Sequence, residues 1–161
     1  MTLSIGDRVP QADLFVAGES GPEKIPYADL FAGRKVVLVG MPGAFTPTCH
    51  RNHLPGFLEN RDAILAKGAD EIVVLTTNDT HVLKAWAEAS GGRDKVRFVS
   101  DGNAEFIQKT GLANDSSARG MGTRSKRFAM IVDDGAITAL LLEEHGGQAI
   151  TSSAARILEA L

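Results

Sequence analysis

The sequence predicts an α/β fold, with a central mixed β-sheet that is covered by helices on both faces. Three apolar runs have the length and the Val, Ile and Leu content of strands buried on both faces. They are Lys35–Gly40, Glu71–Thr76 and Val96–Ser100. Segments with helical character follow each run, which is typical of parallel strands joined by helical crossovers. Two later runs, Arg127–Val132 and Ile137–Leu142, flank Asp-Asp-Gly and predict a β-hairpin.

The N-terminal part of the chain predicts little regular structure before the first buried strand. A short strand is expected near Ala12–Val16, and Gly18–Pro22 has the composition of a turn. After the first buried strand, the loop Gly40–Phe45 should lead into a helix. Thr46 is a suitable N-cap for it, and Pro47 suits the first helical position.

The ends of the later helices are predicted from N-cap residues, from glycines that end helices and from proline. The helix after Pro47 is expected to bend near Pro55-Gly56, since an interior proline removes one hydrogen bond, and to end at Lys67-Gly68. Three further helices are expected to begin at Asn78 or Asp79, at Ala104 and at Ser152 or Ser153. The polar, glycine-containing segment Leu112–Thr123 predicts an exposed loop.

The predicted elements run strand, helix, strand, helix, strand, helix, hairpin, helix. A thioredoxin-like layout, ending in a β-hairpin and a helix, matches this order most closely. No internal repeat or low-complexity segment is visible, and 161 residues are enough for one hydrophobic core. We therefore expect a single domain over residues 1–161.

Composition and charge narrow the classes of partner. The chain is 43% hydrophobic and 23% charged, as ordinary globular proteins are. Its net charge of -3 gives no general attraction to nucleic acid or to an anionic membrane. We expect no signal peptide and no membrane span, because no suitable apolar run is present. The single cysteine, Cys49, can form neither an intrachain disulfide nor a cysteine-rich zinc site. We expect a cytoplasmic protein without a metal or cofactor.

Cys49 falls at the third position of the expected helix. Backbone N–H groups lack intrahelical partners there, and the positive end of the helix dipole is close. A free thiol has a pKa of about 8.5, which a helix N-terminus or a nearby cation lowers, and the thiolate is the nucleophile. A lone cysteine is often only a small buried hydrophobe. The Gly- and Pro-rich loop and the helix start that lead to Cys49 favour a reactive thiol.

Two well-known cysteine chemistries do not match the residues around this thiol. Dithiol exchange needs Cys-x-x-Cys, whereas Thr46 stands three residues before Cys49. A phosphatase loop needs a basic residue a few positions after the cysteine to close a phosphate cradle. This chain has Leu54 and Pro55 in that region.

A Cys–His hydrolase would need one of four histidines as its base. His50 and His53 are expected on the helix of Cys49, pointing away from or below the sulfur, and His81 and His145 are expected to face solvent. A thiolate, a hydroxyl and a closed, rather apolar loop suit the reduction of a peroxide instead, which leaves a sulfenic acid on the cysteine. That reaction needs fixed donors along the O–O bond and a cation, for which arginine is well suited.

The sequence P-G-A-F-T-P-T-C-H-R-N-H-L-P-G-F at 42–57 closely resembles the peroxiredoxin pattern P-x-x-x-T-x-x-C, and specifically that of the peroxiredoxin-5 (type II) subfamily. The resemblance continues through N-D-T-H-V-L-K-A-W at 78–86, D-G-N-A-E-F at 101–106 and R-S-K-R-F-A-M-I-V-D-D-G at 124–135. It implies a thioredoxin-like fold. It also implies an antioxidant thiol peroxidase that acts on hydrogen peroxide and small alkyl hydroperoxides.

The resemblance assigns roles to four residues. Cys49 would attack the peroxide, and Thr46 would hydrogen-bond it. Pro42 would shield the thiolate from water, and Arg127 would hold the thiolate and the substrate oxygen. Without the resemblance, Arg127 would be one of three basic residues at 124–127, each expected to be a solvated charge.

Some family members have a second, resolving cysteine, which this chain lacks. The implied cycle therefore uses one cysteine, and an external thiol reduces the sulfenic acid: glutathione with glutaredoxin, or thioredoxin. The resemblance also implies a homodimer, with Phe45 and Leu112–Gly120 as contributors. An alternative of another class is a non-enzymatic thioredoxin-fold module that binds a partner or senses redox state through Cys49.

Overall fold

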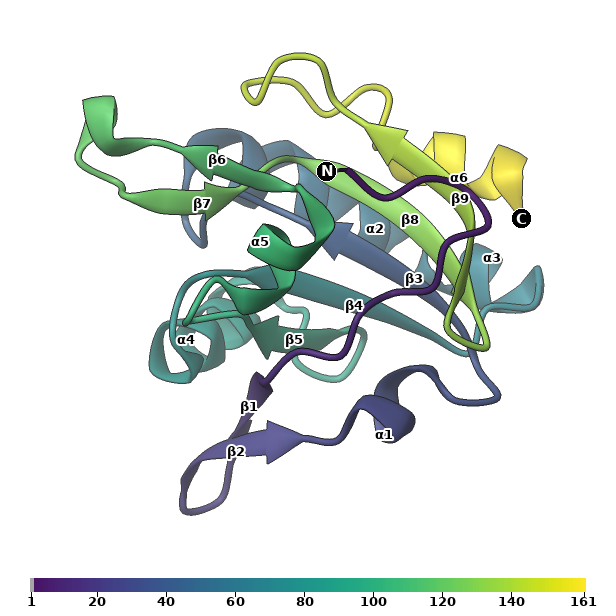
Figure 1. The fold of residues 1–161 in the computed structure, drawn as a ribbon, viewed down its shortest axis with the longest axis horizontal. Coiled ribbons are helices and arrows are strands. Elements are labelled where there is room, and N and C mark those ends of the chain that lie inside the picture. Colours follow the sequence, from purple (N-terminus) through teal and green to yellow (C-terminus); the bar gives the residue numbers. More distant parts are fainter. Residues whose placement is uncertain (1) are drawn as a thin grey trace.

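The computed structural model describes residues 2–161, in which a seven-stranded mixed sheet is flanked by helices (Figure 1). The strands of this sheet, in spatial order, are β2 Gly21–Ile25, β1 Leu14–Gly18, β5 Arg97–Ser100, β4 Glu71–Thr76, β3 Lys35–Gly40, β8 Phe128–Asp133 and β9 Ala136–Leu142. A smaller sheet pairs β6 Ala113–Asp115 with β7 Thr123–Ser125. The helices are α1 Tyr27–Phe31, α2 Leu54–Glu59, α3 Arg61–Ala66, α4 Thr80–Ser90, α5 Glu105–Thr110 and α6 Ala154–Ala160, with a π-helical turn η1 Cys49–His53 and a 3₁₀ turn η2 Ser117–Arg119.

The sheet is mixed, as predicted. Strands β3, β4 and β5 run parallel, whereas β8 runs antiparallel to both β3 and β9. The predicted strands at 35–40 and 71–76 are confirmed at both ends, and β8 and β9 form the predicted hairpin. In its turn, Asp134 and Gly135 have φ angles of 47° and 82°. Two positive φ values in succession match the left-handed geometry that tight hairpin turns favour.

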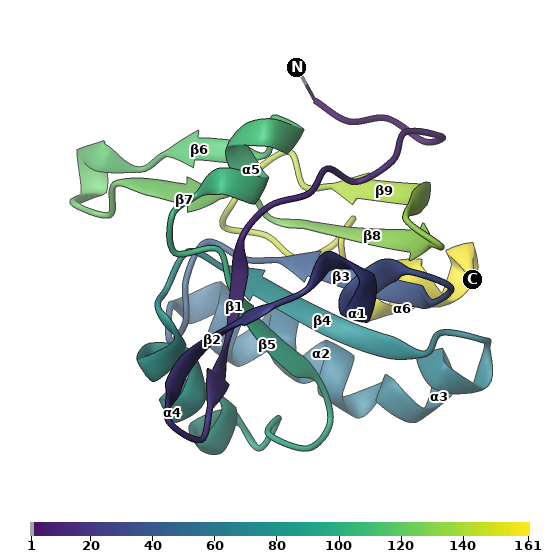
Figure 2. The ribbon, with the colours of Figure 1, turned by 60° about the horizontal axis from the view of Figure 1, so that its bottom comes forward.

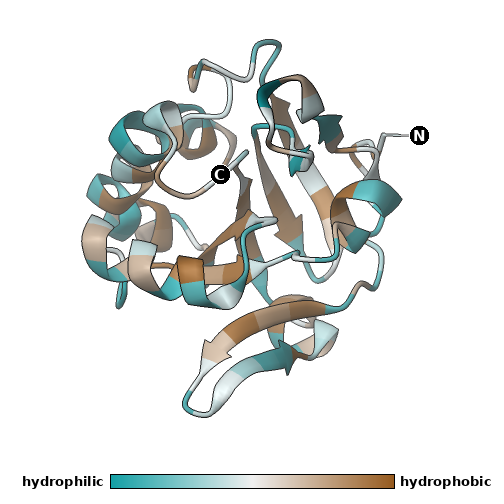
Figure 3. Cartoon of the chain, turned by 90° about the vertical axis from the view of Figure 1, so that its left-hand side faces the viewer, coloured by the Kyte–Doolittle hydropathy of each residue, from teal (hydrophilic) through white to brown (hydrophobic). Residues whose placement is uncertain are grey.

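Both faces of the sheet are covered. Because successive side chains of a strand point to opposite faces, each central strand contributes to a core on either side. In β3, Val36 and Leu38 pack into one core with α1 and α5, whereas Val37 and Val39 pack into a second core with α2, α3, α4 and α6. Figure 2 shows α1 on one side of the sheet and α2 and α3 on the other, and the central strands are mostly brown, hence hydrophobic, in Figure 3. No described helix is both long and apolar enough to cross a membrane.

Two segments hold more structure than the sequence predicts. The N-terminal region contains the β1–β2 hairpin and α1, where only a short strand and a turn were expected. The segment 112–123, expected to be an exposed loop, instead forms most of a β6–β7 arm that closes through η2. The arm strands, Ala-Asn-Asp and Thr-Arg-Ser, lack apolar alternation, so their pairing leaves no pattern in the sequence.

The helix that carries Cys49 begins at Pro47, as predicted, but it is not regular. In η1 the backbone N–H of Leu54 donates to the carbonyl of Cys49, which is the wider spacing of a π-helix. Pro55 accounts for this widening, because it has no N–H to donate and its ring crowds the preceding turn. The predicted irregularity therefore lies just before Pro55, and a second break at Asn60 separates α2 from α3.

Candidate active site

Cys49 is the first residue of η1, and its free thiol is fully buried. The loop after β3 leads directly to it, so the sulfur lies at the edge of the sheet where β3 ends. The carbonyl of Thr46 accepts the backbone N–H of His50 at 2.9 Å, which places Thr46 at the start of the helix. Its hydroxyl, however, donates to the carbonyl of Gly43 at 2.6 Å. Thr46 therefore holds the expected N-cap position, but among the hydrogen bonds of the described residues no backbone N–H donates to its hydroxyl oxygen, so it does not cap the helix through its side chain.

Arg127 reaches Cys49 from a distant part of the sequence. The antiparallel register of β3 and β8 pairs Gly40 with Phe128, so the residue before β8 lies beside the loop that follows β3. From there Arg127 Nη2 donates to Cys49 Sγ at 3.2 Å. The arginine side chain is itself only 3% exposed. The structure therefore brings together the buried sulfur and one of the three basic residues at 124–127.

The other contacts of Arg127 are with neutral acceptors. Its Nε donates to the carbonyl of Gly146 at 3.0 Å, and its Nη1 lies 3.1 Å from Nδ1 of His53. Within the described residues, no carboxylate forms an ion pair with this guanidinium. A buried charge is costly unless it is paired and hydrogen-bonded. The Cys49 sulfur, which accepts from Nη2, is the contact of this guanidinium that would supply a counter-charge as a thiolate.

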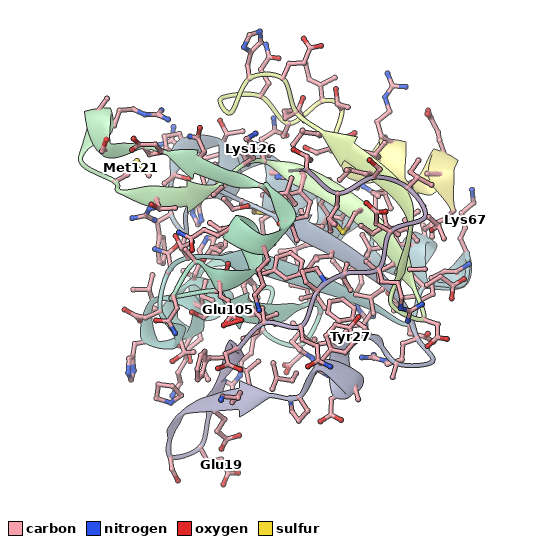
Figure 4. All side chains as sticks on the ribbon, in the orientation of Figure 1. Glu19, Tyr27, Lys67, Glu105, Met121 and Lys126 are labelled. Carbon is pink, nitrogen blue, oxygen red and sulfur yellow. The ribbon has the colours of Figure 1, made fainter. Side chains whose placement is uncertain are left out.

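A cavity of about 590 Å³ opens beside this pair, and Pro42, Thr46 and Arg127 all line it. Its lining also includes Met121 of the β6–β7 arm and Lys126, which follows β7; Figure 4 labels both residues. Its remaining lining residues are Pro47, Thr48, Asn114, Ser116, Arg119, Ser125, Leu142, Glu143, Glu144, Gly146 and Gly147. The predicted Pro42, Thr46 and Arg127 thus share one opening to solvent, next to the buried sulfur.

Arg124 and His53 are two residues of this region whose contacts the sequence analysis missed. Arg124 is half-buried, and its guanidinium donates to the carbonyls of Met121 at 2.8 Å and Pro42 at 3.4 Å, which ties the arm to the active-site loop. His53 is 2% exposed, and its Nε2 lies 2.8 Å from the carbonyl of Ser152. The i, i+4 spacing from Cys49 was the signal that could have placed His53 beside the site.

Burial lowers the pKa of His53 to about 4, and the guanidinium of Arg127 acts in the same direction. The hydrogen bond to the Ser152 carbonyl and the charge of Glu143 raise the pKa, but burial outweighs them. Burial alone would also raise the pKa of Glu143, yet hydrogen bonds from the side chain and backbone of Ser152 and from the neighbouring amides lower it. His53 is therefore a neutral imidazole and Glu143 an anion near neutral pH.

The other histidines do not form a catalytic pair with the thiol. Nδ1 of His50 accepts a hydrogen bond from Trp86 Nε1 at 3.0 Å, and Trp86 is fully buried, as expected of a core anchor. His81 and His145 are exposed, as predicted. Within residues 2–161, no group of three His, Cys, Asp or Glu side chains could hold a metal ion. The described side chain that contacts the Cys49 sulfur is therefore the guanidinium of Arg127 and not a histidine.

Comparisons with known proteins agree with this chemistry. The Redoxin family model matches residues 4–158. Peroxiredoxin-2E-2, chloroplastic, of Oryza sativa subsp. japonica is 44% identical over 165 residues, which cover 99% of this chain and 73% of that protein. Reduced Prx3 from Vibrio vulnificus, solved in complex with H₂O₂, is 40% identical with a TM-score of 0.92 over 99% of both chains. Peroxiredoxin 5 from Alvinella pompejana is 29% identical with a TM-score of 0.85, covering 98% of this chain and 97% of that one.

The match spans nearly the whole chain in sequence and in structure, and Cys49 is the single cysteine that can carry the reaction. The chain therefore belongs to the redoxin family and is a peroxiredoxin of the peroxiredoxin-5 type, a thiol peroxidase with one cysteine.

Proposed function

We propose that this peroxidase reduces hydrogen peroxide and small alkyl hydroperoxides at a site formed by Cys49, Thr46, Arg127 and Pro42. The observation that carries the proposal is the 3.2 Å contact between Arg127 Nη2 and Cys49 Sγ. This guanidinium is buried and has no carboxylate partner among residues 2–161, which favours the thiolate, and the thiolate is the nucleophile. The choice of hydrogen peroxide is supported by the similarity to Prx3 from Vibrio vulnificus, which was solved with H₂O₂.

The reaction begins when the Cys49 thiolate attacks one peroxide oxygen. An S–O bond forms as the O–O bond breaks, and the leaving oxygen takes a proton to become water or an alcohol. The sulfur is oxidised to a sulfenic acid and the peroxide is reduced. Arg127 stabilises the negative charge that passes to the leaving oxygen, as fixed donors do for a developing oxyanion. The Thr46 hydroxyl donates its hydrogen bond to the carbonyl of Gly43, so its lone pairs are left to accept a hydrogen bond from the peroxide O–H.

A thiol from outside the chain completes the cycle, because Cys49 is the only cysteine. One thiol attacks the sulfenic sulfur and water leaves, which forms a mixed disulfide. A second thiol then releases Cys49 and leaves as part of an external disulfide. Glutathione with glutaredoxin, or thioredoxin, fills this role in our proposal, and the cytoplasm supplies such thiols.

We also propose a homodimer that forms through the loops around the site. Phe45 supports this, because its large apolar side chain is 47% exposed and its backbone has a φ of 62°, which is unusual for a bulky residue. The neighbouring β6–β7 arm, which includes 112–120, contributes a second surface in this arrangement. Sedimentation should give a dimer for the native chain and a shift toward monomer for Phe45→Ser.

Rapid-mixing kinetics with less than one equivalent of hydrogen peroxide test the peroxidase site. We expect fast oxidation of Cys49 with one added oxygen by mass spectrometry, and no turnover by Cys49→Ser. Arg127→Ala and Arg127→Gln should each slow oxidation by about a hundredfold or more, since both remove the charge that favours the thiolate. Arg93→Ala removes a charge from an exposed position that does not line the cavity beside Cys49, and it serves as the control. Oxidation as slow as that of free cysteine in the native protein would overturn the proposal.

A further inference from the structure

We propose that His53 is a positioning residue that holds Arg127 against Cys49 through a neutral acceptor, so that the charge of the guanidinium remains available to the sulfur. The inference rests on the proposed function and names a residue that acts through Arg127. Two observations carry it: the contact of His53 Nδ1 with Arg127 Nη1, and the hydrogen bonds that hold the Ser152 carbonyl against His53 Nε2. The tautomer of His53 and the neutrality of its contact with Arg127 follow from them.

The tautomer of His53 follows from its two partners. The carbonyl of Ser152, 2.8 Å from Nε2, can only accept a hydrogen bond, so the imidazole proton lies on Nε2. Nδ1 therefore presents a lone pair to Arg127 Nη1 at 3.1 Å. The ring is 2% exposed, so water does not compete for either bond. His53 thus fixes one arm of the guanidinium while the other arm contacts Cys49.

The Ser152 carbonyl is itself held in place by Glu143. The Glu143 carboxylate accepts the backbone N–H groups of residues 150–152 at 2.9 to 3.2 Å and the Ser152 hydroxyl at 2.6 Å. The backbone N–H of Glu143 in turn donates to the carbonyl of Arg127 at 3.0 Å. The contacts therefore run from Arg127 through His53, Ser152 and Glu143 and back to Arg127. The position of Arg127 depends on this network through both its side chain and its backbone carbonyl.

Neutrality is the property that distinguishes His53 from other possible partners. A carboxylate at this place would hold Arg127 equally well, but it would also neutralise the guanidinium and compete with the thiolate. Two charged groups face the imidazole, Arg127 from the strand side and Glu143 from the end of β9. Glu143 directs its oxygens to the residues at 150–152, and burial keeps His53 uncharged near neutral pH. Arg127 therefore keeps a fixed direction, and no carboxylate among residues 2–161 neutralises its charge.

Three substitutions separate these properties. His53→Asn keeps a neutral oxygen acceptor, His53→Asp has the same shape with a negative charge, and His53→Phe removes the acceptor. The readouts are the pH dependence of Cys49 alkylation, which follows the thiolate fraction, and the rate of oxidation by hydrogen peroxide. We expect His53→Asn to stay within about threefold of the native rate. His53→Phe and His53→Asp should be slower by about ten- to hundredfold, the equivalent of one hydrogen bond to a charged group.

The pair of Asn and Asp variants decides the matter even if the Phe variant does not fold. The inference is overturned if Asn and Asp variants share one alkylation profile and one rate, or if the Phe variant oxidises at the native rate. It is supported if only the Asp and Phe variants require a higher pH for alkylation. A slow native protein would instead overturn the proposed function, which the same kinetic series detects.

Discussion

Acid should destabilise this protein through His53 in particular. The folded chain lowers the pKa of His53 from 6.5 to about 4, mainly by burial. Between these pH values His53 binds a proton in the unfolded chain but not in the folded chain. The free energy of unfolding therefore falls as the pH falls through this window. One pKa unit corresponds to 1.36 kcal/mol, and the integrated loss from pH 7 to pH 5 is therefore about 2 kcal/mol.

Urea unfolding at half-unit steps of pH measures this effect directly. Trp86 is fully buried and is the only tryptophan, so its fluorescence reports the transition. Other groups also respond to acid, among them Glu143, whose lowered pKa means that the stability it contributes is lost as the pH falls. His53→Asn removes the imidazole titration together with the Nε2 hydrogen bond to Ser152, and only the titration varies with pH between pH 7 and pH 5. The difference between the native and variant curves therefore isolates the contribution of His53.

We expect the two curves to converge by about 2 kcal/mol between pH 7 and pH 5, because the variant lacks the acid penalty. Parallel curves over this range would refute the reasoning, since they would mean that the folded protein protonates His53 as readily as the unfolded chain does. Such a result would also remove the argument that His53 is neutral beside Arg127.

Three further changes have effects that follow from single contacts. Gly40→Ala should lower the free energy of urea unfolding by about 1–3 kcal/mol, because a methyl group there would overlap the buried ring of Phe128. Glu143→Gln should weaken the loop that its carboxylate anchors by about 1–3 kcal/mol, seen as faster hydrogen exchange at the amides of 150–152. Asp79→Ala should cost about 1 kcal/mol in the same urea assay, since its carboxylate caps α4, whereas Asp79→Asn should remain close to native.

Much of the central sheet could be predicted because burial on both faces leaves a strong signal. The strands β3 and β4 are almost entirely apolar and end at polar or glycine residues, so both of their ends were predicted correctly. The hairpin was visible because Asp134 and Gly135 suit the positive φ angles of its turn. The β6–β7 arm and β2 gave no such signal. Their residues are polar, and these strands lie at edges where backbone pairing requires no apolar face.

The site was only partly predictable for a different reason. Residues close in sequence, such as Thr46 and Cys49, could be placed on one helix start from local rules. Arg127 lies 78 positions from Cys49, and only the β3–β8 register, which pairs Gly40 with Phe128, brings it near. No local spacing contains that register, so the role expected for Arg127 came from the family resemblance. The contact itself is a property of the folded sheet.

His53 shows how a backbone irregularity contributes to such a site. Pro55 removes a helical donor, and the turn before it widens into η1, with Leu54 N–H bonded to the Cys49 carbonyl. Both ends of this turn meet the same guanidinium, Cys49 through its sulfur and His53 through Nδ1. Pro55, which the sequence predicts only as a bend, therefore lies next to the turn that sets the spacing between Cys49 and His53. Replacing Pro55 with alanine would let the turn tighten to α-helical spacing. We then expect a change in the pH dependence of Cys49 alkylation, which would show that Pro55 affects the sulfur through this turn.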